Sequence, residues 1–404
     1  MADASKTSDR ATIRLMPKAN ARAIRHGAPW VFDNEVVTDR RTRNIEPGTI
    51  ARLEDSARDP MGIVATNPKS RIFARMLDRD PAAVIDRKWL AARLSAALAH
   101  RETLYDEPFY RLVHAEADGL PGVIIDRFGD TAVVQPNAAW AEVLIDDLAA
   151  ALAEVTGVTN ILKNAAGRSR VLEGLDDQNT VLLGQAPEVP IAVPMNRAIY
   201  MADLTGGQKT GLFFDQRPNH AFAASLSKDA SVLDVFSHVG GFSLAALAAG
   251  AKDAVAIDGS APALALAEEG TKRMGAGDRF STAQGDAFDM LTALAEEGAK
   301  FDVVVCDPPA FAPSKKALEP GLRAYERIAR LASDLVAPGG YLVLCSCSHA
   351  ATIDKFRSSS VRGIGRAGRK SQLIHTGYAG ADHPMHPQLA ESGYLKALFF
   401  RLLP

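Results

Sequence analysis

The sequence is poor in cysteine and contains no long hydrophobic run. It has three cysteines in 404 residues, all between positions 306 and 347. That number excludes a disulfide framework, and the spacing is not that of metal ligands. No apolar run approaches the roughly 18 residues that span a membrane. The first ten residues are polar and lack the apolar segment of a signal peptide. These absences predict a cytoplasmic protein with no membrane or metal partner.

The chain also lacks a large excess of charge of either sign. Its 46 Lys and Arg against 48 Asp and Glu give a net charge of −2, which does not indicate a nucleic-acid-binding protein. Residues 355–370 hold six basic and no acidic side chains. Such a stretch is either a solvated helix face or a phosphate-contacting patch, and the charge pattern leaves both open.

The length and the element pattern predict three domains. A 404-residue chain is too long for one core. Residues 12–77 show short strands broken by turns, which predicts a β-barrel-like module; the expected strands are 13–15, 30–32, 49–53, 62–65 and 71–76. A helix over 89–100, strands over 110–114, 122–127 and 131–135, a helix over 139–155 and strands over 160–163 and 180–183 predict an α+β module. We therefore expect domains at 1–80, 81–190 and 191–404.

From about residue 192 onward, strands and helices alternate, which is typical of a parallel sheet. The expected strands are 231–236, 254–258, 280–284, 301–306 and 341–345, with helices over 242–249, 262–273 and 325–335 and a turn at 338–340. Residues 372–375 and 394–403 are expected to form a terminal hairpin. The fold class is therefore α/β.

A candidate cofactor site follows the first of these strands. The turn Gly240-Gly241 permits close approach of a ligand, and ligands of open α/β sheets bind beyond the carboxyl ends of the strands. The turn lacks the Gly-x-Gly-x-x-Gly pattern of dinucleotide sites. Asp234, Asp258 and Asp286 lie at the ends of three successive strands. One such acid alone is more typical of a helix cap or a surface loop. All three together favour S-adenosylmethionine (SAM), with Asp258 on the ribose hydroxyls and Asp286 near the adenine.

Asp307-Pro308-Pro309 follows the buried strand expected over 301–306. Two prolines fix φ, so we expect Asp307 to be held rigidly at the end of this strand. Ser346-Cys347-Ser348 ends the next strand. We expect Cys347 at the same open edge as Asp307, and Cys306 and Cys345 in the core. Because alternate strand residues share a face, Cys345 stays an alternative to Cys347.

A thiol in this position suits chemistry on a pyrimidine ring. Cytosine C5 becomes nucleophilic only after covalent addition at C6. We expect a Cys347 thiolate to add to C6 of an unstacked cytosine. Asp307 would hydrogen-bond the N3/N4 edge, and C5 would take the methyl group of SAM. The sequence does not identify the base that removes the C5 proton.

Seven segments in fixed order carry a family resemblance that covers nearly the whole chain; they are 27–32, 110–129, 208–217, 235–242, 306–311, 345–348 and 383–398. Together they resemble the bacterial 23S rRNA (cytosine-5)-methyltransferases with an N-terminal PUA domain. The resemblance implies a PUA barrel, a central α+β domain and a Rossmann-like class I methyltransferase domain with a seven-stranded, mostly parallel sheet.

The resemblance also implies site residues and partners. The family's nucleophile falls on Cys347, and its SAM pocket adds six residues to those above, namely Gln216, Arg217, Phe236, Ser237, Ala287 and Pro308. The implied substrate is RNA, either 23S rRNA or a large-subunit precursor, and a homodimer is left open. Arginines such as Arg22, Arg25, Arg71 and Arg75 favour RNA contact by the first module. Ala310 departs from the family, which usually has lysine there.

Two other functions stay open from the sequence. Asp307-Pro308-Pro309 resembles segments that serve methylation of a base nitrogen, although Ala310 stands before Phe311 where those enzymes place an aromatic residue. A SAM enzyme acting on a base nitrogen or another RNA is therefore one alternative. The other is an RNA-binding protein that keeps the fold without catalysis.

Overall fold

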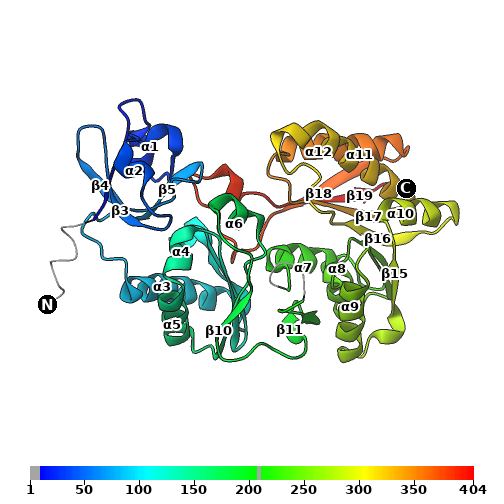
Figure 1. The fold of residues 1–404 in the computed structure, drawn as a ribbon. Coiled ribbons are helices and arrows are strands. Elements are labelled where there is room, and N and C mark those ends of the chain that lie inside the picture. The colour runs from blue at the N-terminus through cyan, green and yellow to red at the C-terminus, as the bar shows by residue number, and fades with distance from the viewer. Residues whose placement is uncertain (1–9, 207–210) are drawn as a thin grey trace. The chain divides into compact units, whose positions relative to one another are not determined.

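The computed structural model describes residues 10–206 and 211–404 (Figure 1). Packing divides them into two units, which we describe separately. The first ends at Ala186 and also includes Pro384–Leu389, and the second comprises Pro187–His383 with Ala390–Pro404. The polar N-terminus and Gln208, Lys209 and Thr210 of the 208–217 segment lie outside the described residues. The three-domain division stays a prediction.

The first unit begins with a curled five-stranded sheet, as predicted. Its strands are β1 (Thr12–Arg14), β2 (Trp30–Phe32), β3 (Ile50–Glu54), β4 (Pro60–Thr66) and β5 (Ile72–Asp78), in the order β1-β3-β4-β5-β2. Leu15 and Val36 lie just after the edge strands β1 and β2 and form a β-bridge with each other. This bridge connects the two edges, so the sheet closes on itself. Alternate residues such as Ile13 and Leu53 are fully buried inside. The short helices α1 (Ala21–Arg25) and α2 (Arg40–Arg43) were not predicted.

A second five-stranded sheet follows in the same unit. It has the order β10-β9-β8-β7-β6, formed by β6 (Phe109–His114), β7 (Val123–Phe128), β8 (Thr131–Pro136), β9 (Asn160–Lys163) and β10 (Thr180–Leu183). Helix α3 (Arg87–Leu104) packs on α5 (Ile145–Thr156), and the buried Trp140 lies in their common core. The helix predicted over 139–155 is interrupted at Leu144, which separates α4 (Ala139–Val143) from α5. Helix α6 (Arg168–Glu173) is additional.

The second unit opens with an antiparallel hairpin, β11 (Ile191–Met195) and β12 (Ala198–Ala202). The prediction that strand–helix alternation starts near residue 192 is therefore wrong for this segment, since Asn196 and Arg197 make a tight turn with positive φ. A 3-10 turn, η4 (Phe214–Gln216), and helix α7 (Arg217–Ser225) then lead into the main sheet.

The main sheet has seven strands in the order β15-β14-β13-β16-β17-β19-β18, as the class I methyltransferase fold predicts. They are β13 (Ser231–Val235), β14 (Asp253–Asp258), β15 (Phe280–Gln284), β16 (Phe301–Cys306), β17 (Val336–Ser346), β18 (Ser371–Gly377) and β19 (Lys396–Leu402). The first five in the order pair in parallel, and β19 is antiparallel to both of its neighbours. The terminal hairpin is thus confirmed.

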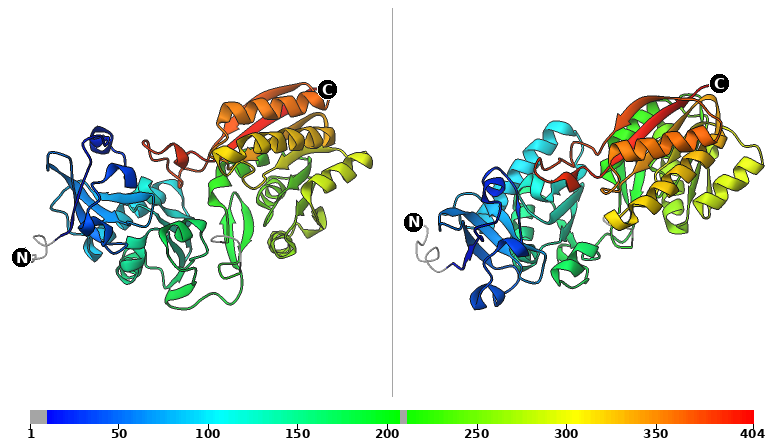
Figure 2. Two further views of the ribbon diagram at one scale, coloured as in Figure 1. Left: turned by 45° about the horizontal axis from the view of Figure 1, so that its top comes forward. Right: turned by 90° about the horizontal axis from the view of Figure 1, so that it is seen from above.

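Helices cover both faces of this sheet. Helices α10 (Ala287–Glu296), α11 (Leu318–Leu335) and α12 (Ile353–Arg366) share one core with Val304 and Cys306 of β16. Helices α7 and α8 (Gly241–Ala248) share the other core with Val303 and Val305, and α9 (Ala261–Arg273) packs beside α8. Figures 1 and 2 show α11 and α12 lying side by side. No helix within the described ranges is long and apolar enough to cross a membrane.

The turn predicted at 338–340 lies within strand β17. The pairing of β16 with β17 jumps from Phe301↔Val336 to Val303↔Tyr341, so these residues bulge out of the ladder. Gly339 has a φ of 82°, which glycine adopts without strain. The glycines therefore bend a strand instead of ending one.

Candidate active site

Parallel pairing brings the carboxyl ends of four strands to one edge of the sheet. Val235 of β13 pairs with Ile257 of β14 and with Cys306 of β16, and Cys306 pairs in turn with Leu344 of β17. The segments that begin at Phe236, Asp307 and Cys347 therefore all leave the sheet at this edge, where open α/β sheets bind ligands.

The loop after β13 has unusual backbone geometry. Phe236 and His238 have φ angles of 61° and 49°, and Gly240 has 79°. Positive φ is costly for a bulky residue such as phenylalanine and clusters at ligand-binding loops. Two hydrogen bonds hold the loop against β14: Ser237 N donates to Ile257 O at 3.0 Å, and His238 N donates to Asp258 Oδ2 at 2.9 Å.

The two glycines of this loop are needed for packing. A Cβ atom on Gly240 would lie 2.4 Å from Leu244 Cδ1, and one on Gly241 would lie 2.6 Å from His220 Nε2. His220 is buried under the loop, and burial lowers its pKa to about 3, so its ring is neutral. Sequence reasoning missed His220 because it lies in a helix some 20 residues upstream with no motif around it.

Asp234 is fully buried in strand β13 and faces the start of α8. Its Oδ2 accepts a hydrogen bond from Ser243 N at 2.9 Å, and its Oδ1 has no hydrogen-bond partner in residues 10–206 and 211–404. Burial raises the pKa of this carboxyl to about 6. Hydrogen bonding to backbone amides at the start of α8 lowers the pKa and so offsets part of that rise. This placement suits a carboxylate that orients the loop and the helix N-terminus. Its contact with a cofactor stays a prediction.

Asp258 and Asp286 stand at the ends of β14 and β15. Asp258 accepts one backbone hydrogen bond on each oxygen, from Ser260 N and His238 N. Asp286 caps α10, and its Oδ1 accepts from Phe288 N and Asp289 N, while Ala287 is buried in the first turn. A carboxylate oxygen has room for two hydrogen bonds, so both acids keep acceptor capacity for ribose or adenine.

These residues fit SAM better than they fit a dinucleotide. The loop offers a glycine turn at which added Cβ atoms would clash and a buried hydroxyl, Ser237 Oγ, that has no hydrogen-bond partner among the described residues. The ends of β14 and β15 add two carboxylates with spare acceptor sites. An unpartnered buried hydroxyl costs free energy unless a ligand satisfies it. The acidic edge would repel a pyrophosphate, whereas the sulfonium of SAM carries positive charge.

Gln216 connects the predicted catalytic and cofactor residues. Its Nε2 donates to Asp307 Oδ2 at 2.9 Å, and its Oε1 accepts from Asn219 Nδ2 at 2.6 Å. Asp307 N also donates to Val235 O at 3.2 Å, which ties its loop to β13. Pro308 is buried beside it, whereas the neighbouring Arg217 guanidinium lies over the Phe214 ring at 5.5 Å. The structure thus joins Gln216 and Asp307 directly.

The three cysteines divide as predicted. Cys306 and Cys345 are fully buried, and burial raises the pKa of both thiols well above the usual range. Cys347 is half-buried, one residue beyond the end of β17. A raised pKa opposes thiolate formation, so Cys345 is a poor nucleophile and Cys347 is the better candidate.

The two serines around Cys347 explain the Ser-Cys-Ser motif. Both are fully buried and both meet the Tyr325 hydroxyl at 2.8 Å, from Ser346 Oγ and from Ser348 Oγ. Ser348 Oγ also accepts from Ala312 N at 2.9 Å, in the loop that follows Pro309. The network therefore holds the Cys347 loop against the Asp307 loop. Sequence reasoning missed Tyr325, which looks like an ordinary core residue of an amphipathic helix.

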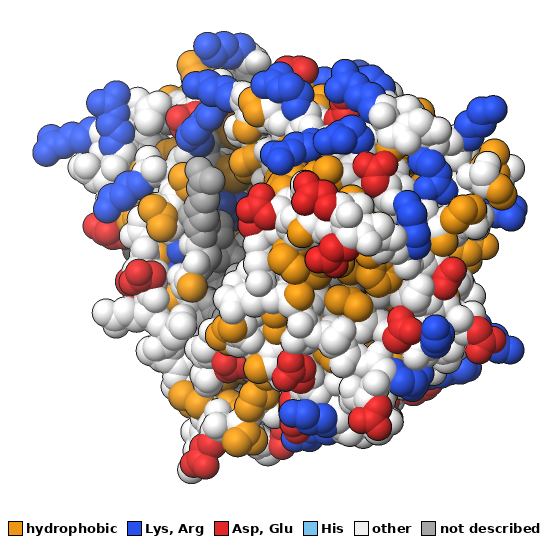
Figure 3. All heavy atoms as spheres, turned by 90° about the vertical axis from the view of Figure 1, so that its right-hand side faces the viewer, with side chains coloured by type: hydrophobic (Ala, Val, Ile, Leu, Met, Phe, Trp, Pro, Cys, Tyr) orange, Lys and Arg blue, Asp and Glu red, His pale blue; other side chains and the backbone are white. Residues whose placement is uncertain are grey.

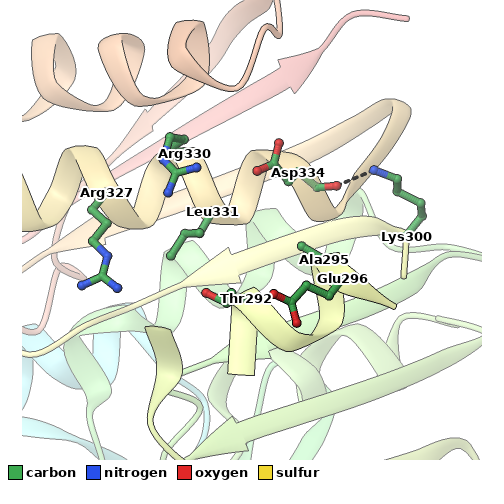
Figure 4. A pocket seen from close by; sticks show the side chains of 8 residues that line it. All are labelled: Thr292, Ala295, Glu296, Lys300, Arg327, Arg330, Leu331 and Asp334. Carbon is green, nitrogen blue, oxygen red and sulfur yellow. Dashed lines mark hydrogen bonds between the residues drawn. The ribbon is translucent and has the colours of Figure 1, made fainter. Parts of the chain in front are cut away.

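The structure also has a groove away from this edge of the sheet. It has a volume of about 610 Å³ and runs between α10 and α11, as Figure 4 shows; its lining residues are Thr292, Ala295, Glu296, Lys300, Arg327, Arg330, Leu331 and Asp334. Lys300 and Asp334 precede β16 and β17, so the groove lies toward the amino ends of these strands. Lys300 Nζ donates to the Asp334 carbonyl across it. Because Asp307 and Cys347 follow the opposite ends of the same strands, this groove is separate from the candidate site.

Basic side chains gather along the upper part of the face in Figure 3. The 355–370 stretch includes most of α12, and several of its basic side chains bind other groups of the same protein. Arg362 and Arg366 pair with Glu326, and Arg369 donates to three backbone carbonyls near the start of β17. These contacts favour a structural role for a large part of this stretch.

The arginines of the first module differ in exposure. Arg75 is largely buried, pairs with Glu116 at 3.1 Å and Glu173 at 3.0 Å, and lies over the Trp30 ring. It is therefore structural. Arg22 and Arg71 are exposed, and Arg25 is half-exposed beside Asp55.

Within residues 10–206 and 211–404, no cluster of three or more His, Cys, Asp or Glu is placed to hold a metal.

Comparison with known proteins gives consistent matches. A model of S-adenosylmethionine-dependent methyltransferases matches residues 147–401, and a PUA-like domain model matches residues 13–79. The chain is 34% identical over 396 residues to Ribosomal RNA large subunit methyltransferase I of Aliivibrio fischeri, covering 96% of this chain and 98% of that protein. It is also 34% identical over 400 residues to the Ribosomal RNA large subunit methyltransferase of Deinococcus radiodurans, covering 95% and 96%.

Solved structures share the fold. A SAM-dependent methyltransferase from Streptococcus mutans has a TM-score of 0.80 at 18% identity, covering 97% of this chain and 100% of that one. A methyltransferase solved in complex with SAH has a TM-score of 0.81 at 18% identity, with the same coverage. At this identity the likeness concerns the fold alone.

Proposed function

We propose that this chain, which belongs to the family of S-adenosylmethionine-dependent methyltransferases, forms 5-methylcytosine in large-subunit ribosomal RNA. Its cofactor is SAM. Two curated relatives that match nearly its whole length are named for methylation of large-subunit ribosomal RNA, and the chain carries the PUA-like domain ahead of the methyltransferase domain. The proposed substrate is 23S rRNA or its precursor, in the cytoplasm.

A single observation carries the choice of cytosine C5. Cys347 is the one half-buried thiol beside two buried ones, and it follows β17 at the edge where β13 and β16 also end. Methylation of an exocyclic amine or a ring nitrogen needs no thiol, because those atoms carry their own lone pair. Attack by carbon C5 does need one, since C5 becomes nucleophilic only in an adduct.

The protein's own residues would act in the following order. The Cys347 thiolate adds to C6 of an unstacked cytosine, and the electron pair moves toward N3. Asp307, oriented by Gln216, hydrogen-bonds the N3/N4 edge and in its protonated form gives N3 the proton that neutralises the charge developing there; N3 returns this proton when C5 takes up the methyl group. SAM supplies the electrophilic methyl group that C5 takes up. Loss of the C5 proton to a base then restores the double bond and releases the Cys347 thiolate.

The hydrogen-bond network around Cys347 would hold its thiol in a fixed position relative to the Asp307 carboxylate. Tyr325 and Ser348 connect the two loops through hydrogen bonds of 2.8–2.9 Å, so the thiol and the carboxylate would move together. Catalysis depends on such pre-positioning, because a displacement of about 1 Å can lower a rate a hundredfold. The loop of residues 236–241, with Asp258 and Asp286, would hold SAM.

The test is to map 5-methylcytosine in ribosomal RNA from cells with and without this protein, and with the Cys347→Ala variant. The proposal expects one bisulfite-resistant cytosine in 23S rRNA that disappears in both altered strains, while purified Cys347→Ala still binds SAM by calorimetry. Cys345→Ala is the matched control and should keep the modification. Normal 5-methylcytosine with Cys347→Ala would refute the thiol mechanism. Labelled methyl on a base nitrogen would indicate the alternative reaction, and absence of SAM affinity in the wild type would indicate a non-catalytic protein.

A further inference from the structure

A lysine is buried directly beneath the Cys347 loop. Lys396 begins strand β19, pairs opposite Ser346 of β17, and is only 4% exposed. Alternate residues of β19, Leu398 and Phe400, point into the apolar core shared with α11. An ammonium group in such a place is unusual, because burying a charge is costly unless it is compensated.

The contacts of Lys396 are with the loop that carries Cys347. Its Nζ donates to the carbonyl oxygens of Ser348 at 2.7 Å and Ala351 at 2.9 Å, both in buried positions. Ser348 immediately follows Cys347, so the ammonium holds the loop on the C-terminal side of the cysteine. Among the described residues, no carboxylate lies within ion-pair distance of this ammonium.

Buried cations elsewhere in the chain have carboxylate partners. Lys163, which is 8% exposed, has its Nζ 2.7 Å from Glu142 Oε1, and Arg101 forms two hydrogen bonds with Asp118. Lys396 has two neutral carbonyls in place of a carboxylate. A thiolate at Cys347 would supply the missing negative charge.

The electrostatics agree with this arrangement. Burial lowers the pKa of Lys396 to about 8, and the neighbouring Cys347 thiolate acts in the opposite direction. Attraction between two charges is mutual, so a cation whose pKa is raised by a thiolate lowers the pKa of that thiol. With a pKa of about 8, the amine is still mostly protonated at neutral pH.

Other titratable groups stand on the elements around this loop. They are Tyr325 on α11, Asp307 after β16, Cys345 on β17, His349 within the loop, and Asp354 and Lys355 at the exposed start of α12. Burial raises the pKa of Cys345, and the Asp307 carboxylate adds to this rise; burial also raises the pKa of Tyr325, and a Cys347 thiolate acts in the same direction. Negative charge at Asp307 would oppose a thiolate on the neighbouring loop, and a cation there would favour one.

We propose that Lys396 is a positioning residue for the nucleophile: its ammonium fixes the loop of residues 347–351 through two carbonyls and favours the thiolate form of Cys347. It touches neither the base nor the methyl group in this scheme. The proposal rests on the assignment of Cys347 under the proposed function, but its effect on the thiol can be measured without RNA or SAM.

The first test measures the rate of alkylation of Cys347 by iodoacetamide as a function of pH. Cys347→Ala gives the background from the two buried thiols. We expect Lys396→Met to move the midpoint of the profile to higher pH, so that alkylation at neutral pH slows about tenfold, as one pKa unit implies. Lys396→Arg keeps the charge and should restore most of the rate. An unchanged midpoint in a folded Lys396→Met protein would overturn the proposal.

A second measurement does not depend on the folding of a Lys396 variant. The 13Cε chemical shift of Lys396 is titrated in the wild type and in Cys347→Ser, which cannot form a thiolate. Removal of the thiolate should lower the pKa of Lys396. Equal titration midpoints in the two proteins would contradict the coupling. These results stand apart from methyl transfer, so a protein that shows the coupling but makes no 5-methylcytosine would refute the proposed function and leave the Lys396 inference intact.

Discussion

The buried cations of the first unit differ from the buried polar groups at the carboxyl edge of the sheet in the second unit. In the first unit, the buried cations Arg101 and Arg170 are paired with the carboxylates of Asp118 and Glu142. The buried carboxylate of Asp126 is likewise paired, with the largely buried Arg111. At the carboxyl edge of the sheet in the second unit, side-chain networks such as that of Tyr325 stand beside buried groups that have backbone partners alone or none. Within the part of the chain that the structure describes, Lys396 donates to two backbone carbonyls, and Ser237 Oγ and Asp234 Oδ1 have no hydrogen-bond partner.

This difference distinguishes buried groups that stabilise the fold from buried groups that are available to a ligand or a reaction. A closed ion pair satisfies both charges, so it holds two segments together and has little left to offer a ligand. A buried group that lacks a partner costs stability and is retained where a ligand or a reaction uses it. The hydrogen bond that joins two family motifs of the first unit, from Trp30 to Glu116, therefore supports the fold, whereas the motifs of the second unit are the ones expected to do chemistry.

The largest effect should come from breaking a closed pair in the first unit. Arg101 is fully buried and donates to Asp118 at 2.8 and 2.7 Å. Arg101→Met leaves that carboxylate without its cation, which should lower the free energy of unfolding by about 3–5 kcal/mol. Urea denaturation checks this, and SAM affinity of the folded variant should be unchanged.

Arg87 provides a control on the same helix. It pairs with Glu154 at the surface, with half of its side chain exposed. Arg87→Met should change stability by less than about 1 kcal/mol. Equal losses from the two variants would mean that burial does not distinguish these pairs.

The next effect concerns acid stability in the second unit. Burial lowers the pKa of His220 to about 3 in the folded protein, from 6.5 when unfolded. The unfolded chain therefore takes up the proton first, and the stability that neutral His220 contributes is lost as pH falls from 6.5 toward 3. Over this window the loss should amount to a few kcal/mol, or roughly 1.4 per pKa unit.

Asp234 has the opposite effect on the pH dependence of stability. Burial raises its pKa to about 6 from 3.8, so its contribution to stability increases as pH falls through that interval. His220→Gln should therefore weaken or reverse the acid slope in urea midpoints measured across this pH range. If the slope of the variant matches that of the wild type, His220 is not buried as a neutral ring.

The smallest effect tests the unpartnered hydroxyl of the cofactor loop. Ser237→Ala removes an unsatisfied Oγ, so it should leave stability unchanged or slightly higher while weakening SAM binding by about 1 kcal/mol, as calorimetry would detect. Ser333→Ala is the matched control, since Ser333 Oγ donates to Ala329 O at 2.6 Å in α11. That variant should lose about 1 kcal/mol of stability and keep its SAM affinity. The same response from both variants would remove the distinction between the two hydroxyls.

Much of the fold was predictable because it depends on local periodicity. The apolar run 301–306 placed β16 correctly, and the run 341–345 placed the carboxyl end of β17 to within one residue, although β17 begins earlier, at Val336. The expected end of this strand, and not the alternation along it, separated Cys347 from the two buried cysteines. The hairpin β11–β12 was missed, since its tight turn uses Asn196 and Arg197 with positive φ and contains no glycine.

The residues that support the site were much less predictable. Tyr325 reaches Ser346 across 21 positions, and Lys396 reaches Ser348 across 48. Each lies in an otherwise regular helix or strand, and only tertiary pairing reveals its partner. The roles of Asp234, Asp258 and Asp286 toward SAM stay predictions, because the structure gives each of them a backbone hydrogen bond as well.

Trapping of the covalent adduct tests the role of Cys347 most directly. RNA containing 5-fluorocytidine, incubated with the protein and SAM, should stay attached because fluorine at C5 blocks the final elimination. We expect the adduct to map by mass spectrometry to Cys347, to form with Cys345→Ala and to be absent with Cys347→Ala. An adduct at Cys345, or one that persists without the Cys347 thiol, would contradict the assignment of Cys347 as the nucleophile.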